Sequence, residues 1–262
     1  MKKLLFLPIF MIFTIQGMSP DADVWILNGI KYRKVDLALF DHVTDENIEL
    51  IDELVKKGAD INAIGTNQIS LVMQMTMLGR KKVVDRLIEL GVRLNDIDSE
   101  GNSLLMFNPT GRSAGLLIYL MIPDINTIEK LIRAGANVNT QNKRGSTPLI
   151  FAASRGKLDL VKLFVKYGAL IDHRDIEDKN AIDIAQEQLK HENDKAKEYQ
   201  IEEKILSLKQ IIDFLEKTRA ENIEKRKRIV QEEAAKYIST GSYGPLQYVL
   251  EYAEEYVPEL EL

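Results

Sequence analysis

Four segments of this chain end in the same short pattern, and their spacing is the feature that most limits its fold. They are LVKKGADINA, LIELGVRLND, LIRAGANVNT and LFVKYGALID, at residues 54–63, 87–96, 131–140 and 163–172. Their marker glycines are Gly58, Gly91, Gly135 and Gly168, which are separated by 33, 44 and 33 residues. The middle value is one period of 33 plus an insertion of 11 residues. A fixed period of this length indicates a solenoid of stacked repeats.

Each marker glycine follows an apolar pattern with helical spacing, such as Leu160, Val161 and Phe164. A glycine at this point predicts a helix C-cap, because that position needs a positive φ. An apolar residue beside Asn or Asp follows each glycine, which predicts a short turn whose polar side chain bonds to neighbouring backbone. Ten residues beyond the four markers lie Gln68, Gly101, Gly145 and Asp178, each followed by a second apolar run.

The stretch NKRGSTPLIFAASRGKLDLVKLFVKYGALID, residues 142–172, resembles a nearly complete ankyrin repeat. The residues that match the family pattern are Gly145, Thr147, Pro148, Leu149, Ala152, Ala153, Gly156, Gly168 and Ala169. Thr147 and Pro148 predict the start of a helix, with threonine as the cap and proline at the first helical position. Ile150 departs from the family, which usually has His there, so the polar network of that His is not expected here.

Weaker copies of this unit precede and follow it. GNSLL (101–105) and NQISLV (67–72) keep part of the turn, DKNAIDIA (178–185) keeps the apolar spacing, and an opening repeat starts near Tyr32. The resemblance covers about residues 32–216 and implies an all-α ankyrin-repeat solenoid of stacked helix–turn–helix units with β-turn tips. We therefore predict about five repeats within 18–216, followed by a charged C-terminal helical extension at 217–262.

The N-terminus, MKKLLFLPIFMIFTIQG, predicts a signal peptide over residues 1–17. Lys2 and Lys3 precede an apolar run from Leu4 to Ile15, which is shorter than the roughly 20 residues that span a bilayer. An exported protein, periplasmic or secreted, is the expectation. One alternative is an uncleaved segment that anchors the chain to a membrane, because Ile15 stands where a cleavage site prefers a small residue. A further alternative is a buried N-terminal helix.

Two insertions and a terminal segment interrupt the regular pattern. Residues 108–124 predict an extended first helix with a longer loop, or alternatively a protruding contact loop, and the charged stretch 186–200 predicts a prolonged first helix in the fifth repeat. An apolar stripe then predicts a last helix that caps the array, at Ile201, Ile205, Leu208, Ile212 and Leu215. Near the end, Tyr248, Tyr252 and Tyr256 share one helical face in an acidic segment, which either folds back on its own domain or docks on a partner.

The composition argues against several kinds of site. The charge of −5 does not favour nucleic acid as a partner, because phosphate binding needs a basic field. The chain has no cysteine and only three histidines, so thiolate chemistry and a histidine-based metal site are not expected. KRGSTP lacks the order of a phosphate-binding loop, and no G-x-S-x-G elbow occurs. His173 is interpreted as a turn residue, and we predict no catalytic residue, no metal, no cofactor and no small-molecule substrate.

The ankyrin resemblance implies protein binding rather than catalysis, through the concave surface of turns and first helices. Rigid repeated surfaces suit this role because little entropy is lost when they bind. The family's usual contact positions fall on turn tips and on the exposed positions that follow them. In this sequence they are Thr66, Asn67, Ile69, Ser99, Glu100, Asn102, Lys143, Arg144, Ser146, Ile176, Glu177 and Lys179.

The expected function is therefore an exported module that binds a protein of unknown identity, as an inhibitor, an immunity protein or an accessory factor. One alternative is a membrane-tethered assembly scaffold that retains residues 4–15. A further alternative is an enzyme whose site lies in the C-terminal extension. A truncation near Lys217 separates the last alternative from the first two.

Overall fold

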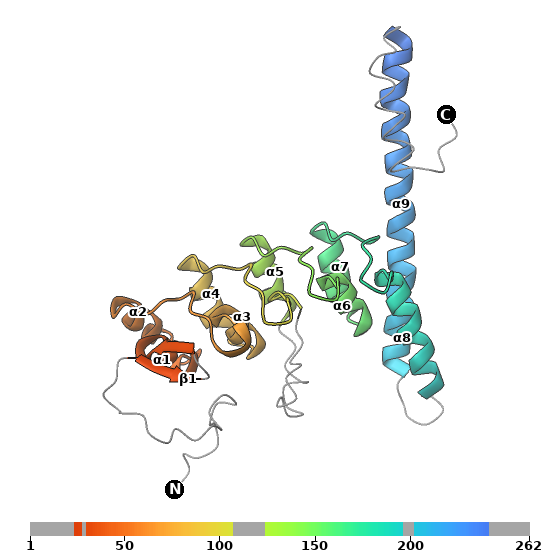
Figure 1. Cartoon of the computed structure of the whole chain (residues 1–262). Helices are drawn as coiled ribbons and strands as arrows, with labels where there is room; N and C mark the ends of the chain where they lie inside the picture. Colours follow the sequence, from red (N-terminus) through yellow and green to blue (C-terminus); the bar gives the residue numbers. More distant parts are fainter. Residues whose placement is uncertain (1–23, 28–29, 107–123, 196–201, 241–262) are drawn as a thin grey trace. The chain divides into compact units, whose positions relative to one another are not determined.

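The computed structural model describes residues 24–27, 30–106, 124–195 and 202–240 of the 262-residue chain. Helices dominate these residues (Figure 1). Their order is β1 (Val24–Leu27), β2 (Ile30–Arg33), α1 (Lys34–His42), α2 (Glu49–Lys56), the 3₁₀ turn η1 (Thr66–Gln68), α3 (Leu71–Met77), α4 (Lys81–Glu89), α5 (Ile125–Arg133), α6 (Pro148–Ser154), α7 (Leu158–Lys166), α8 (Ala181–Lys195) and α9 (Glu202–Thr240).

The chain divides into two compact units, and the division passes through α6 and α7. Unit 1 contains residues up to Ala152 together with Lys162–Ala169. Unit 2 contains Ala153–Val161 together with the residues from Leu170 onward. The predicted signal peptide at 1–17, the insertion at 108–124 apart from Asp124, and the three C-terminal tyrosines lie outside the described residues.

The marker glycines end the second helix of each repeat, as predicted. Their φ angles are +88° at Gly58, +76° at Gly91, +108° at Gly135 and +85° at Gly168. The N–H group of the next residue reaches back to close each helix, for example from Ala59 to the Leu54 carbonyl at 2.9 Å. This return bond satisfies a carbonyl that the helix end would otherwise leave unpaired, which explains why the glycine recurs in register.

Asparagines in the turns after Gly58, Gly91 and Gly135 bond to the next repeat. The Asn95 side chain accepts a hydrogen bond from the Asn137 N–H at 2.8 Å and donates one to the Gly135 carbonyl at 3.1 Å. Asn62 likewise accepts from the Arg93 N–H at 2.7 Å. The sequence predicted bonds to neighbouring backbone, and the fold places that backbone 31 to 42 residues away along the chain.

The helix that starts at Thr147 and Pro148 also forms as predicted. α6 begins at Pro148, and the Thr147 hydroxyl accepts a hydrogen bond from the Ile150 N–H at 3.4 Å. Leu149 and Ala153 are fully buried. Ile150, where the family usually has His, is 4% exposed and packs as an apolar core residue.

Unit 2 contains the long helices α8 and α9, which pack on each other. α8 extends to Lys195, in agreement with the predicted prolonged helix. Leu208, Ile211 and Leu215 form the fully buried face of α9, so the stripe includes Ile211 where the sequence predicted Ile212. Ile212 is half-buried because it lies about 100° round the helix from its neighbour. α9 runs through residue 217 without a break.

A two-stranded hairpin precedes α1 and was not predicted. β1 and β2 pair antiparallel, with Trp25 opposite Tyr32 and Leu27 opposite Ile30. A signal for it exists in the sequence, because Asn28-Gly29 stands between two apolar-rich runs.

Candidate functional site

Three of the hairpins that connect successive repeats are held by one carboxylate or amide side chain each, which belongs to Asp98, Asn142 or Asp175. Asp98 Oδ1 accepts hydrogen bonds from the N–H groups of Glu100 and Asn102, both at 2.8 Å. Asn142 and Asp175 make the same pair of bonds in the next two hairpins. The three residues are 44 and 33 positions apart, which is the register of the marker glycines.

The hairpin between the first and second repeats is built differently. Gly65 takes the position of Asp98, and a Cβ there would lie 3.3 Å from Cε1 of Phe40. A capping side chain at this position would therefore press against the Phe40 ring. Asn67 and Gln68 form the turn with φ angles of +56° and +59°, a region that residues other than glycine rarely adopt.

The four residues ten positions after the marker glycines all have positive φ. The values are +59° at Gln68, +81° at Gly101, +71° at Gly145 and +60° at Asp178. Two of these positions are not glycine, so the left-handed conformation comes from the hairpin rather than from the residue type.

Backbone hydrogen bonds join the hairpin tips of unit 1 into one row. The Ser99 N–H donates to the Asn67 carbonyl at 2.8 Å, and the Lys143 N–H donates to the Glu100 carbonyl at 3.0 Å. We call residues 66–69, 99–100 and 143–146 the tip row. Its backbone is fixed from one repeat to the next before any partner binds.

Most of the predicted contact residues lie on accessible surface. Asn67, Glu100, Lys143 and Arg144 are exposed, while Ile69, Ser99 and Ser146 are partly exposed. In unit 2, Ile176 is 71% exposed, Glu177 is exposed, and Lys179 is partly exposed in ion pairs with Glu177 and Glu187. Thr66 lies in η1, and its side chain is outside the described part.

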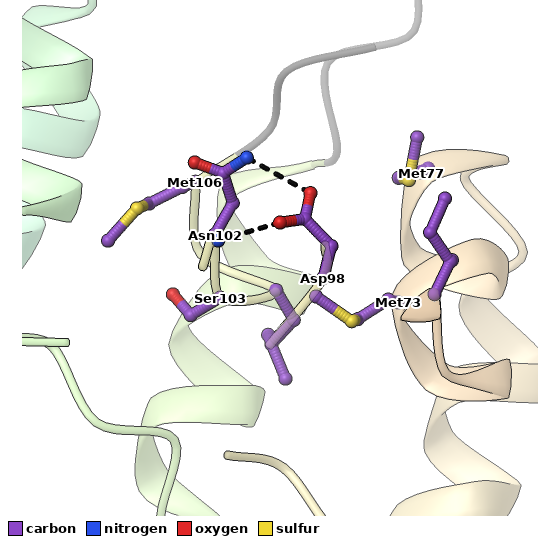
Figure 2. Close-up of a pocket in the computed structure, with 8 residues that line it drawn as sticks. Met73, Met77, Asp98, Asn102, Ser103 and Met106 are labelled. Atoms are coloured by element: carbon purple, nitrogen blue, oxygen red, sulfur yellow. Dashed lines mark hydrogen bonds between the residues drawn. The ribbon is translucent and has the colours of Figure 1, made fainter. Parts of the chain in front are cut away.

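Asn102 was predicted to be an exposed contact residue, and this prediction is wrong. The residue is 5% exposed. Its Nδ2 donates to Asp98 Oδ2 at 3.0 Å, and its Oδ1 accepts from Asn142 Nδ2 at 2.8 Å. Figure 2 shows the bonds from Asn102 to Asp98. A polar side chain one position after a turn glycine looks accessible in a sequence, but here it links two successive hairpins from inside.

A small hollow lies behind the tip row and was missed at the sequence level. It is lined by Ile69, Met73, Met77, Asp98, Asn102, Ser103, Leu104 and Met106, and encloses about 30 Å³ (Figure 2). That volume holds a water molecule or a methyl group rather than a cofactor. The spacing of the methionines in the sequence did not indicate this hollow, because Met106 belongs to a different repeat from Met73 and Met77.

Ion pairs connect the second helices of successive repeats. The Arg86 guanidinium lies 2.8 Å from Asp52 Oδ1, and Lys130 Nζ lies 2.7 Å from Asp85 Oδ2. Glu129 then accepts from Lys166 Nζ at 3.0 Å and from the Tyr167 hydroxyl at 2.7 Å. The Tyr167 hydrogen bond, with further bonds from Lys166 and Arg133, lowers the pKa of Glu129 from 4.5 to about 2. Glu129 is therefore an anionic link between α5 and α7.

The parts of the chain that the structure describes contain no group of three or more His, Asp or Glu side chains arranged to hold a metal ion. In the same ranges, no helix combines the length and the apolar character needed to cross a membrane.

Comparisons with known proteins agree with this architecture. Residues 131–185 match the family model described as ankyrin repeats, many copies. The chain is 30% identical over 149 residues to alpha-latrocrustotoxin-Lt1a of Latrodectus tredecimguttatus, which covers 56% of this chain and 10% of the toxin. It is 33% identical over 114 residues to cyclin-dependent kinase inhibitor 2A of Monodelphis domestica, covering 43% of this chain and 60% of the inhibitor. A putative ankyrin repeat protein of Acanthamoeba polyphaga mimivirus is 30% identical over 105 residues, which are 40% of this chain and 61% of that protein.

The chain thus spans between a tenth and about three fifths of the length of these relatives. One of these relatives is named as an ankyrin repeat protein, and ankyrin repeats typically form protein–protein interaction modules without catalysis. The periodic glycine caps, the turn asparagines that bond to the next repeat, the joined hairpins and the family match at residues 131–185 lead to one conclusion: this chain contains ankyrin repeats and is similar to proteins of the ankyrin-repeat family.

Proposed function

We propose that this protein binds a protein partner through the tip row and the first-helix surface of its ankyrin repeats. The observation that carries the proposal is the pair of backbone bonds, Ser99 to Asn67 and Lys143 to Glu100, that orders the tips of three hairpins. A surface that is ordered before binding loses little entropy when the partner docks, so its affinity depends on side-chain contacts.

The side chains along the tip row are varied, which suits recognition of one partner surface. Glu100 supplies negative charge, Lys143 and Arg144 supply positive charge, and Asn67 supplies an amide. One relative is named as an inhibitor of a cyclin-dependent kinase. Inhibitor, immunity protein and accessory factor are the roles that we propose, and each works by occupying the partner's surface.

The test compares partner capture by the wild-type chain and by a charge-reversed tip, Lys143→Glu with Arg144→Glu. We expect the variant to lose the captured partner, or to bind it on the order of tenfold more weakly, as for a contact near the centre of an interface. The matched control is Lys162→Glu, on an exposed position of α7. Equal capture by all three proteins, with unchanged thermal unfolding, excludes the tip row as the binding surface.

We also propose that the chain is exported and that residues 1–17 are removed. The support is the basic start at Lys2 and Lys3 followed by a short apolar run. N-terminal sequencing of the protein from its native cell is expected to begin at Met18 or later. A first residue before Leu4, in a membrane fraction that resists alkaline extraction, would support the tethered scaffold instead.

A further inference from the structure

The outer half of α9 contains two buried apolar side chains. Val230 is 2% exposed and Ala234 is 6% exposed. Polar contacts join α9 to other segments at Lys204, Ser207, Glu216 and Arg219, in the earlier part of the helix.

This burial is confined to one side of the helix. Ile229, the neighbour of Val230, is 46% exposed. Ile223 and Lys227 are half-buried, and with Val230 and Ala234 they follow one another at intervals of 4, 3 and 4 residues. Such intervals define one helical stripe, so the cover lies along one face of α9. We call these four residues the outer stripe.

The charge around the outer stripe favours an acidic occupant. Residues 217–236 contain seven Lys or Arg and four Asp or Glu, and four of the basic residues are consecutive at 225–228. The segment 246–262 contains five Glu and no Lys or Arg. Tyr248, Tyr252 and Tyr256 recur every four residues in it, which gives one aromatic face if the segment is helical.

We propose that residues 246–257 fold back as a helix on the outer stripe of α9, with the tyrosine face over Val230 and Ala234. The sequence STGSYGP at 239–245 contains two glycines and a proline, which suits a reversal of the chain. Counting ten residues each way from Ser242, the middle of that sequence, places Tyr252 level with Glu232, between the two buried side chains. The interaction is intramolecular, and it does not depend on binding at the tip row.

Disulfide trapping in the full chain tests the register directly. The chain has no cysteine, so every cross-link comes from the introduced pair. A disulfide needs Cα atoms within about 7 Å of each other. We expect Ala234→Cys with Val249→Cys to form an intramolecular disulfide under mild oxidation. The control pair is Glu232→Cys with Val249→Cys, since Glu232 is exposed on the opposite side of the helix.

The first pair should cross-link on the order of tenfold faster than the control, because only its two cysteines face each other in the proposed contact and so have a high effective concentration. Equal rates for the two pairs contradict the proposal. A product that is only an intermolecular dimer, and that disappears on dilution, also contradicts it and identifies a second copy of the chain as the cover.

Limited cleavage by chymotrypsin provides a second measurement that leaves the tyrosines in place. We expect Val230→Glu to accelerate cleavage after Tyr248 and Tyr252 severalfold, because it puts a charge against the acidic segment in an apolar contact. Ile229→Glu, on the exposed side, should leave the rate unchanged. Higher salt should also accelerate cleavage of the wild-type tail, since it screens the charges. Identical rates for both variants would contradict the proposed contact.

Discussion

Single residues in this protein are fixed by the backbone conformation that each repeat demands. Gly91 and Gly101 both have positive φ, at +76° and +81°, yet their surroundings differ. A Cβ at Gly91 would meet nothing within 4 Å, whereas one at Gly101 would lie 3.0 Å from the Lys143 nitrogen and 3.1 Å from the Asn142 Cα. Those two atoms belong to the backbone of the next hairpin, so they move only if the hairpins separate.

Two alanine substitutions separate the conformational cost from the steric cost. Gly91→Ala should lower the free energy of unfolding by about 1 kcal/mol, the usual cost of a side chain at positive φ. Gly101→Ala should lower it by about 3 kcal/mol, because the same cost is joined by strain against the neighbouring hairpin. Urea unfolding at neutral pH measures both values. Equal losses for the two variants would show that the hairpins can separate freely.

At the scale of elements, polar side chains hold each repeat to the next. Asn95 bonds both an N–H and a carbonyl of the following repeat, and Glu129 accepts three bonds from α5 and from the end of α7. These contacts lie beside a core of apolar residues such as Leu87, Leu131 and Phe164. The core supplies apolar burial, and the polar contacts join each repeat to its neighbour at defined atoms.

Asn95 offers a test of this linkage. Asn95→Ala should reduce the free energy of unfolding by about 1 kcal/mol, since two hydrogen bonds to the Asn137 N–H and the Gly135 carbonyl are lost at an exposed site where water replaces them. Asn95→Asp keeps the acceptor and should lose less. Lys82→Ala, on the exposed face of α4, serves as the surface control. A loss no larger than that of the control contradicts a linking role.

Glu129 makes the linkage depend on pH. Its pKa is lowered from 4.5 to about 2 in the folded protein, so the folded state binds the proton less readily than the unfolded state. The stabilisation is therefore complete at pH values above the pKa of Glu129 in the unfolded state, and it is lost as the pH falls toward about 2. Glu129→Gln should lower Tm at pH 7, with a modest effect because solvent screens the site. The difference in Tm from wild type should shrink between pH 4.5 and 2 in thermal melts, and a constant difference would contradict this assignment.

At the scale of the whole molecule, a solenoid needs a last element with one apolar face and one polar face. α9 provides it, since Leu208, Ile211 and Leu215 are fully buried while Lys209 and Asp213 are exposed. Without that cover, the apolar side of α8 would face water and would favour association between chains.

Leu208→Asp should therefore cost about 3 kcal/mol or more in stability and produce soluble aggregates. The control Lys209→Asp introduces aspartate at the neighbouring exposed position and should leave stability and oligomeric state near wild type. Size-exclusion chromatography with light scattering, together with urea unfolding, measures the two effects. An unchanged oligomeric state in Leu208→Asp would show that α9 is dispensable as a cap.

The periodic features of this fold could be predicted from the sequence because they depend on local rules. Gly58, Gly91, Gly135 and Gly168 mark helix ends, and Thr147 with Pro148 marks a helix start, since each residue type is preferred at its position for steric or hydrogen-bonding reasons. The repeat register follows from counting between these residues. The prediction that all helices of a repeat stack on their neighbours needs nothing more than that register.

Tertiary structure decided what each position faces. Asn102 follows a turn glycine and was expected at the surface, but the adjacent hairpin covers it through Asn142. Gly65 lacks the capping side chain of its equivalents, and a Cβ there would lie only 3.3 Å from the ring of Phe40, 25 residues earlier. The buried stripe of α9 includes Ile211 rather than Ile212 because α8 sets the side from which the helix is covered. Sequence periodicity determines where the elements begin and end, whereas contacts between residues distant in the chain determine which surfaces remain available for a partner.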